Sequence, residues 1–162
     1  ANTPGNDYIG RLSRRFDFNY INLGFSGSAK GEQAMMDYIA GLDMSMFVYD
    51  YDHNAPDSEH LAATHYKGYQ TVRAAHPDIP IIMASRPTYD HPRENTAARR
   101  DVIAASYERA RAEGDGNVYF VDGAKVFSTF FADGCTVDGT HPTDLGFYRM
   151  AEAFGEVMAR IF

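Results

Sequence analysis

Short apolar segments alternate with longer amphipathic segments along this chain, and that alternation is the strongest constraint on its fold. A helix that joins two successive strands brings the second strand back parallel to the first. The sequence therefore predicts an α/β fold of three layers, with a mostly parallel sheet covered by helices on both faces. We expect strands at residues 20–23, 46–49, 79–84 and 117–121, and helices at 31–42, 58–75, 95–112 and from 143 onward.

Length and charge limit the classes of partner. A chain of 162 residues can bury a substantial core, so we expect one domain over residues 1–162. The net charge is −7 and the sequence has no Lys/Arg run, which argues against nucleic acid and anionic membrane as partners. The single cysteine, Cys135, excludes an internal disulfide framework. The chain begins at Ala1 without an initiator Met, so its location stays open between cytoplasmic and secreted.

Asp138 and His141, in Asp138-Gly-Thr-His141-Pro, are the first candidate catalytic residues. An imidazole can take a proton near neutral pH, and a nearby carboxylate can orient it and stabilise its charged form. The structural alternative is that Asp138 caps a turn and His141 is an ordinary surface residue. The pair supplies a base and its orienting acid, but it supplies no nucleophile.

Residues 24–28 follow the first expected strand, where ligands bind in open parallel sheets. Gly24-Phe-Ser26-Gly-Ser28 resembles the nucleophile elbow G-x-S-x-G, which makes Ser26 an alternative nucleophile. A structural interpretation is a tight turn that needs positive φ at glycine, with Ser28 as a helix cap. A third is that backbone N–H groups face an oxyanion. We favour a turn that also donates to an oxyanion.

Acidic residues and histidines gather after the second expected strand, in Asp50-Tyr-Asp52-His53-Asn54 and at Asp57 and His60. Such a group is compatible with a metal site. Asp-x-Asp at a strand end, with Ser85 after the next strand, also resembles haloacid-dehalogenase-like phosphatases. However, their nucleophilic strand opens the domain, and their Lys and paired acidic motifs are not matched here. We expect no metal, and we expect Asn54 to present its amide to the site.

Taken together, Asn22-Leu-Gly24-Phe-Ser-Gly, Asn54 and Asp138-x-x-His141-Pro resemble the SGNH (GDSL-type) hydrolase superfamily, close to a bacterial branch of GDSL-like esterases. The resemblance covers nearly the whole chain and implies a serine esterase that acts on small acyl esters, such as acetylated carbohydrate. It implies that Gly24 and Asn54 stabilise the oxyanion, that His141 is the general base and that Asp138 orients it. It implies no metal and no organic cofactor.

The first block of that family, Gly-Asp-Ser or Gly-Ser-Ser with the nucleophilic serine, is not matched. Residues 4–8 already resemble the approach to the first helix, so the block and its strand would lie upstream of Ala1. The flavodoxin-like strand order that the family implies makes that strand central, and its absence would leave backbone groups unpaired. We therefore expect an N-terminal piece that carries this strand and the serine. It is either a cleaved fragment that stays bound, as a partner besides the small ester substrate, or a part of the protein that the printed sequence does not include.

Two other functions stay open. One is a catalytically silent carbohydrate- or acyl-binding domain that has lost its nucleophile. The other is an Mg²⁺-dependent phosphatase with an aspartate nucleophile, Asp50. Under the esterase interpretation, Tyr51, Arg86 and Tyr89 follow strand ends and are expected to line the pocket.

Overall fold

The structure is a computed structural model that describes residues 3–88, 96–128 and 130–162. Its contacts divide the chain into two compact units. The first unit comprises Ala1–Leu23, Pro87–Arg93 and Val121–Phe162, and the second comprises Gly24–Arg86 and Glu94–Phe120. Tyr89, which was expected to line the pocket, lies outside the described residues.

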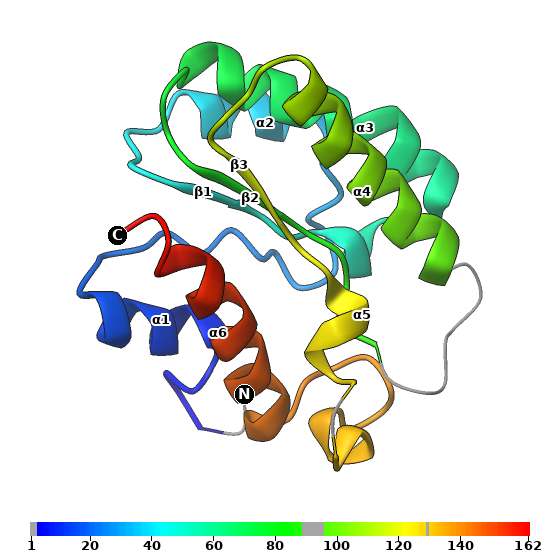
Figure 1. Cartoon of the computed structure of the whole chain (residues 1–162). Coiled ribbons are helices and arrows are strands. Elements are labelled where there is room, and N and C mark those ends of the chain that lie inside the picture. The colour runs from blue at the N-terminus through cyan, green and yellow to red at the C-terminus, as the bar shows by residue number, and fades with distance from the viewer. Residues whose placement is uncertain (1–2, 89–95, 129) are drawn as a thin grey trace. The chain divides into compact units, whose positions relative to one another are not determined.

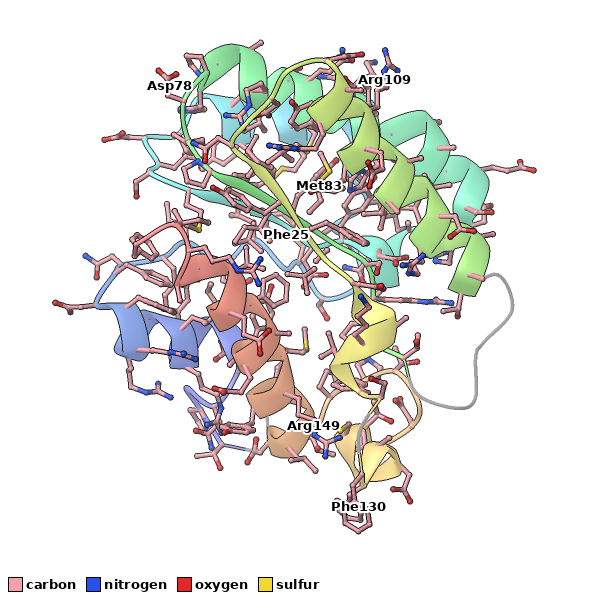
Figure 2. All side chains as sticks on the ribbon, in the orientation of Figure 1. Phe25, Asp78, Met83, Arg109, Phe130 and Arg149 are labelled. Carbon is pink, nitrogen blue, oxygen red and sulfur yellow. The ribbon has the colours of Figure 1, made fainter. Side chains whose placement is uncertain are left out.

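The second unit is built on a small sheet with the strand order β1-β2-β3 (Figure 1). The strands are β1 (Phe47–Tyr49), β2 (Ile81–Ala84) and β3 (Val118–Val121). β1 and β2 run parallel, with Phe47 opposite Ile81 and Tyr49 opposite Met83. All four residues of β2 are buried, and Figure 2 shows Met83 among the side chains of the sheet. A continuous apolar strand of this kind is typical of a parallel sheet.

Three helices of the second unit lie next to one another, with α3 (Ser58–Ala75) in contact with both α2 (Gln33–Ala40) and α4 (Thr96–Ala112) (Figure 1). α3 begins after Asp57, whose carboxylate accepts a hydrogen bond from the His60 backbone N–H at 2.7 Å. Asp57 is therefore the N-cap of α3. The short helix η1 (Asp52–Asn54) follows β1 directly.

The first unit contains α1 (Tyr8–Phe16), α5 (Gly123–Val126), η2 (Ala132–Cys135) and α6 (Asp144–Met158). α1 lies against α6, where the Tyr8 ring stacks on Phe154 with centroids 4.8 Å apart and Leu12 is fully buried (Figure 1). No helix in the described part of the chain combines the length and apolar character that a membrane span requires.

The fold class is confirmed as α/β, and most of the expected elements form to within two residues. The strand expected at 20–23 is wrong. Residues 18–25 form no helix or strand, and Tyr20 and Ile21 are exposed. An extended segment becomes a strand only by pairing its backbone with a neighbour. No described strand pairs with this segment, because the strand order ends at β1.

Candidate active site

The candidate base lies in a tight turn over residues 136–142, here called the His–Asp turn. Thr136 and Pro142 form an isolated antiparallel bridge, and the Val137 N–H donates to the His141 carbonyl at 3.0 Å. Gly139 has φ +82°, a left-handed conformation that glycine adopts at little cost. The turn therefore bends the chain so that residues 138 and 141 face each other.

Asp138 uses its two carboxylate oxygens for different purposes. Oδ1 accepts hydrogen bonds from the backbone N–H groups of Thr140, at 2.9 Å, and His141, at 2.8 Å. Oδ2 lies 2.6 Å from Nδ1 of the His141 ring. Asp138 thus caps the turn and holds the imidazole at the same time, so the structural interpretation and the catalytic one are compatible.

The surroundings of Asp138 favour its charged form. The backbone N–H of His141, the His141 side chain and then the Thr140 N–H hold the pKa of the Asp138 carboxyl well below its usual range. An ionised carboxylate accepts the proton on Nδ1, which leaves Nε2 as the acceptor nitrogen of the neutral ring. The His141 side chain is 76% exposed, so an incoming group can reach Nε2. This is the arrangement that a general base requires.

Arg149 of α6 fixes the loop that precedes the His–Asp turn. Its guanidinium donates to the Cys135 Sγ at 3.2 Å and to the Phe130 carbonyl. Figure 2 shows the Phe130 side chain extending outward from the loop beside η2, and the residue is 94% exposed. Sequence reasoning missed Arg149, because an arginine on an amphipathic helix has the pattern of a solvated face.

Thr143 and Gly146 join the other end of the turn to α6. The Thr143 hydroxyl accepts from the Gly146 N–H at 3.2 Å as the helix cap, and it donates to the Gly134 carbonyl at 2.7 Å. The Thr143 N–H donates to the Cys135 carbonyl at 2.9 Å. The start of α6 therefore lies directly against the backbone that leads into the His–Asp turn.

Gly146→Ala is expected to reduce the free energy of unfolding by about 1–3 kcal/mol. A Cβ at this position would lie 2.1 Å from the Cys135 carbonyl oxygen and 3.0 Å from the Pro142 Cβ, and backbone cannot rotate away. The clash exceeds the gain of about 1 kcal/mol that alanine brings to a helix interior. Urea denaturation measures the change.

Gly155→Ala, in the same helix, is the matched control. A Cβ added at Gly155 would lie 2.7 Å from the Arg15 Nη1, which is the end of a flexible and exposed side chain that can move. We expect unchanged or slightly higher stability. An equal loss in both variants would show that the approach of Gly146 to Cys135 is unimportant.

The candidate oxyanion glycine and the alternative nucleophile lie in an exposed turn of the second unit. Ser26 has φ 45° and Gly27 has φ 85°, and the Ser26 N–H donates to the Gly24 carbonyl. The expected turn is present, with positive φ at residues 26 and 27. Ser28 as helix cap is wrong, because α2 begins after Glu32.

Asn54 lies in η1 at the end of β1, half-buried, and its backbone N–H donates to the Tyr51 carbonyl at 2.9 Å. Tyr51, which was expected to line the pocket, is a core residue, since its buried ring stacks on the rings of Tyr49 and His65. The Arg86 guanidinium donates to the Thr96 hydroxyl at 2.5 Å.

The acidic cluster around Asn54 is used in structural contacts. Asp52 is fully buried and bound by Arg99, Asp57 caps α3, and the His60 Nε2 lies 2.7 Å from the Lys30 carbonyl. Within residues 3–88, 96–128 and 130–162, no group of His, Cys, Asp and Glu side chains could hold a metal ion. The charge density that resembled a metal or phosphatase site thus has structural partners.

The structure brings Asp138 and His141 together in the first unit, whereas Gly24, Ser26 and Asn54 belong to the second. That the two sets form one active site stays a prediction.

The chain matches the family described as GDSL-like Lipase/Acylhydrolase over residues 1–159. Among solved structures, one described as a GDSL-like lipase from Bacteroides ovatus is 34% identical over 98% of this chain, with a TM-score of 0.86. A salicylyl-acyltransferase from a tetracycline biosynthetic pathway is 20% identical over 99% of the chain (TM-score 0.83). A family two carbohydrate esterase from Clostridium thermocellum, in complex with cellohexaose, is 18% identical over 95% (TM-score 0.67).

No curated protein matches the chain. The chain spans 48%, 50% and 54% of those three structures, so it is about half their length. The two structures below 25% identity show the shared fold alone. With a family match over residues 1–159 and the SGNH hydrolase fold, the chain belongs to the GDSL-like lipase/acylhydrolase family of hydrolases.

Proposed function

We propose that this chain supplies the general base and oxyanion donors of a serine esterase that hydrolyses small acyl esters, including acetyl esters of carbohydrate. The observation that carries the proposal is the His–Asp turn, where the Asp138 Oδ2 lies 2.6 Å from the His141 Nδ1. Membership of a lipase/acylhydrolase family supports it. So does the structural likeness to a carbohydrate esterase, at the level of fold.

The proposed reaction proceeds by acyl transfer to serine and then to water. The serine oxygen attacks the ester carbonyl while the His141 Nε2 takes its proton, and Asp138 stabilises the imidazolium. The Gly24 N–H and the Asn54 amide donate to the oxyanion of the tetrahedral intermediate. His141 returns the proton to the departing alcohol, and the C–O bond of the ester breaks. Water then attacks the acyl-serine with His141 again as base, which releases the acid and the free serine.

The serine is proposed to lie upstream of Ala1, on a strand that belongs to the same SGNH-hydrolase-like domain as residues 1–162. β1 ends the strand order, so among the described residues no strand pairs with its outer edge. An unpaired edge accepts a further strand through backbone hydrogen bonds. The strand and its serine could belong to a cleaved fragment that stays bound or to a continuous chain. Intact-mass analysis of folded material tests the fragment, and a single species that starts at Ala1 would exclude it.

Hydrolysis of p-nitrophenyl acetate tests the function. We expect activity from the full-length protein, which includes the residues upstream of Ala1, and none from residues 1–162 alone. Binding of acetylated sugar without hydrolysis by either chain would favour a silent binding domain. Mg²⁺-dependent phosphatase activity that is lost in Asp50→Asn and independent of His141 would favour the phosphatase.

Asn54→Ala in the full-length protein is expected to lower kcat by about 10²–10³, the usual cost of one oxyanion donor. KM should change little, because the donor acts on charge that develops in the transition state. Steady-state kinetics on p-nitrophenyl acetate measure both constants.

Asn117→Ala is the control for Asn54→Ala. The Asn117 amide donates to the Asp78 carbonyl at 2.6 Å, just before β2 and β3 begin. Loss of this hydrogen bond in Asn117→Ala should lower the free energy of unfolding and leave kcat unchanged. A kcat for Asn54→Ala that equals the wild-type value would remove Asn54 from the oxyanion hole.

A further inference from the structure

Arg99 is a buried arginine of α4 whose side chain reaches the backbone on both sides of Asn54. Its Nε donates to the Asp52 Oδ1 at 2.8 Å, and its Nη2 donates to the carbonyls of Asp52 and, at 2.9 Å, Ala55. The Arg99 side chain is 4% exposed and that of Asp52 is fully buried. The guanidinium thus binds one carbonyl before Asn54 and one after it.

Asp52 extends this contact to a second strand end. Its Oδ2 accepts a hydrogen bond at 2.8 Å from the backbone N–H of Arg86, which follows β2. The buried carboxylate therefore links the turn after β1, the chain after β2 and helix α4. All of these residues belong to the second unit.

Asn54 itself contributes little to its own placement. Its backbone N–H is bound to the Tyr51 carbonyl, and its side-chain amide makes no hydrogen bond within the described part of the chain. The position of the amide is therefore set by the backbone of Asn54. Whatever fixes the carbonyls of residues 52 and 55 also fixes the amide.

We infer that Arg99 is a positioning residue, which acts through Asn54 and rests on the proposed function of that amide. Arg99 holds the Asn54 turn (residues 52–55) so that the amide is already oriented before an oxyanion forms. Preorganised donors stabilise a transition state without reorganisation at the moment of reaction.

The chemistry of the contact favours this role over simple stabilisation. A buried ion pair is weak evidence for stability, because its attraction must offset the desolvation of two charges. A guanidinium, however, is a rigid planar fork that binds several acceptors in fixed directions, whereas a lysine is a flexible point charge. Arg99 uses that fork on three acceptors of one turn. Lysine would neutralise Asp52 and lose the geometry.

The test is a double-mutant cycle of Arg99→Lys and Asn54→Ala in the full-length protein, with kcat and KM measured on p-nitrophenyl acetate. We expect Arg99→Lys to lower kcat by about 10-fold to 100-fold with little change in KM, since a displacement of about 1 Å has that effect. In the Asn54→Ala background, the same substitution should change kcat by less than about 3-fold, because the amide that Arg99 positions is gone.

Arg73→Lys is the matched structural control. Arg73 binds Asp115 at 2.9 Å and donates to the carbonyls of His76, Pro77, Ile79 and Asn117, which lie before β2 and β3 begin. Like Arg99, Arg73 binds one carboxylate and several backbone carbonyls. Its contacts lie before the strands begin, whereas Asn54 lies after a strand has ended. We expect Arg73→Lys to lower the thermal midpoint of unfolding and to leave kcat within about 3-fold of the wild-type value, as is usual for sites without shared partners.

Each outcome decides the inference. An equal loss of kcat from Arg99→Lys in both backgrounds would make Arg99 a general structural residue and overturn it. An unchanged kcat in Arg99→Lys, while Asn54→Ala is impaired, would overturn it and leave the proposed function intact. An unchanged kcat in Asn54→Ala would overturn both. If Arg99→Lys fails to fold, Asp52→Asn, which keeps an acceptor for Arg99, enters the same cycle.

Discussion

His141→Ala in the full-length protein is expected to lower kcat for p-nitrophenyl acetate by about 10⁴–10⁶, as loss of the base does in serine hydrolases. The alanine cannot take the serine proton or return it to the departing alcohol. The reason lies in the His–Asp turn, where Asp138 holds Nδ1 and leaves Nε2 as the only basic nitrogen. The measurement is steady-state ester hydrolysis, with active protein quantified by an acyl-enzyme burst in the wild type.

Asp138→Asn separates the chemistry of the carboxylate from its structural role. The asparagine Oδ1 can still accept the backbone N–H groups of Thr140 and His141, so the turn should persist. Its NH₂ group would face Nδ1, which favours the tautomer with the proton on Nε2 and blocks the base. We expect a loss of about 10⁴ in kcat with the turn retained.

His76→Ala is the control for both variants. The His76 ring Nε2 lies 3.0 Å from the Ala40 carbonyl, a structural contact of the second unit. Its kcat should equal that of the wild type. An ester hydrolysis rate that survives His141→Ala would remove the esterase proposal altogether.

Local patterns in the sequence predicted most of the elements. β2 is an apolar run with every residue buried, and Asp57 lies directly before the first turn of α3. The Asp138–His141 contact was predictable for the same reason, because three residues of backbone determine it. Such features depend on residues that are close together in the sequence, so they can be predicted from the sequence alone.

Features that depend on distant partners could not be predicted. Asp52 resembled a metal ligand until the structure placed Arg99, 47 residues further along the chain, against it. Residues 20–23 have the composition of a strand, but a strand needs a partner, and composition carries no information about one. The left-handed φ of Ser26 depends on the turn that surrounds it.

The burial of His65 predicts that the folded protein loses stability in mild acid. It is fully buried on α3, and its ring stacks on Tyr49 and Tyr51 with centroids 4.7 and 5.8 Å apart. Neither ring nitrogen has a hydrogen-bond partner within the described residues. Burial disfavours the charged ring, which lowers the pKa of His65 from 6.5 to about 3.

The sign of the pH dependence follows from which state binds the proton. The unfolded chain takes up a proton at His65 near pH 6.5, whereas the folded chain resists it until about pH 3. Stability is therefore lost as the pH falls through that window, by about 2 kcal/mol between pH 7 and pH 5 and about 4 kcal/mol by pH 3. Asp138, whose folded pKa is also depressed, adds a loss of the same sign, but its window lies below its ordinary pKa of 3.8. The interval from pH 7 to pH 5 thus isolates His65 from that carboxyl.

His65→Phe should abolish this part of the pH dependence. Phenylalanine can keep the stack on Tyr49 and Tyr51, does not titrate, and leaves no unpaired ring nitrogen in the core. Its larger ring costs some packing at every pH, about 1–3 kcal/mol, so the slope with pH is diagnostic and the absolute stability is not. Urea denaturation at pH 7, 6 and 5 measures both proteins. Equal slopes would mean that His65 finds a partner or a charge in the folded state, because a neutral, unpaired imidazole must lose stability as the unfolded chain gains its proton.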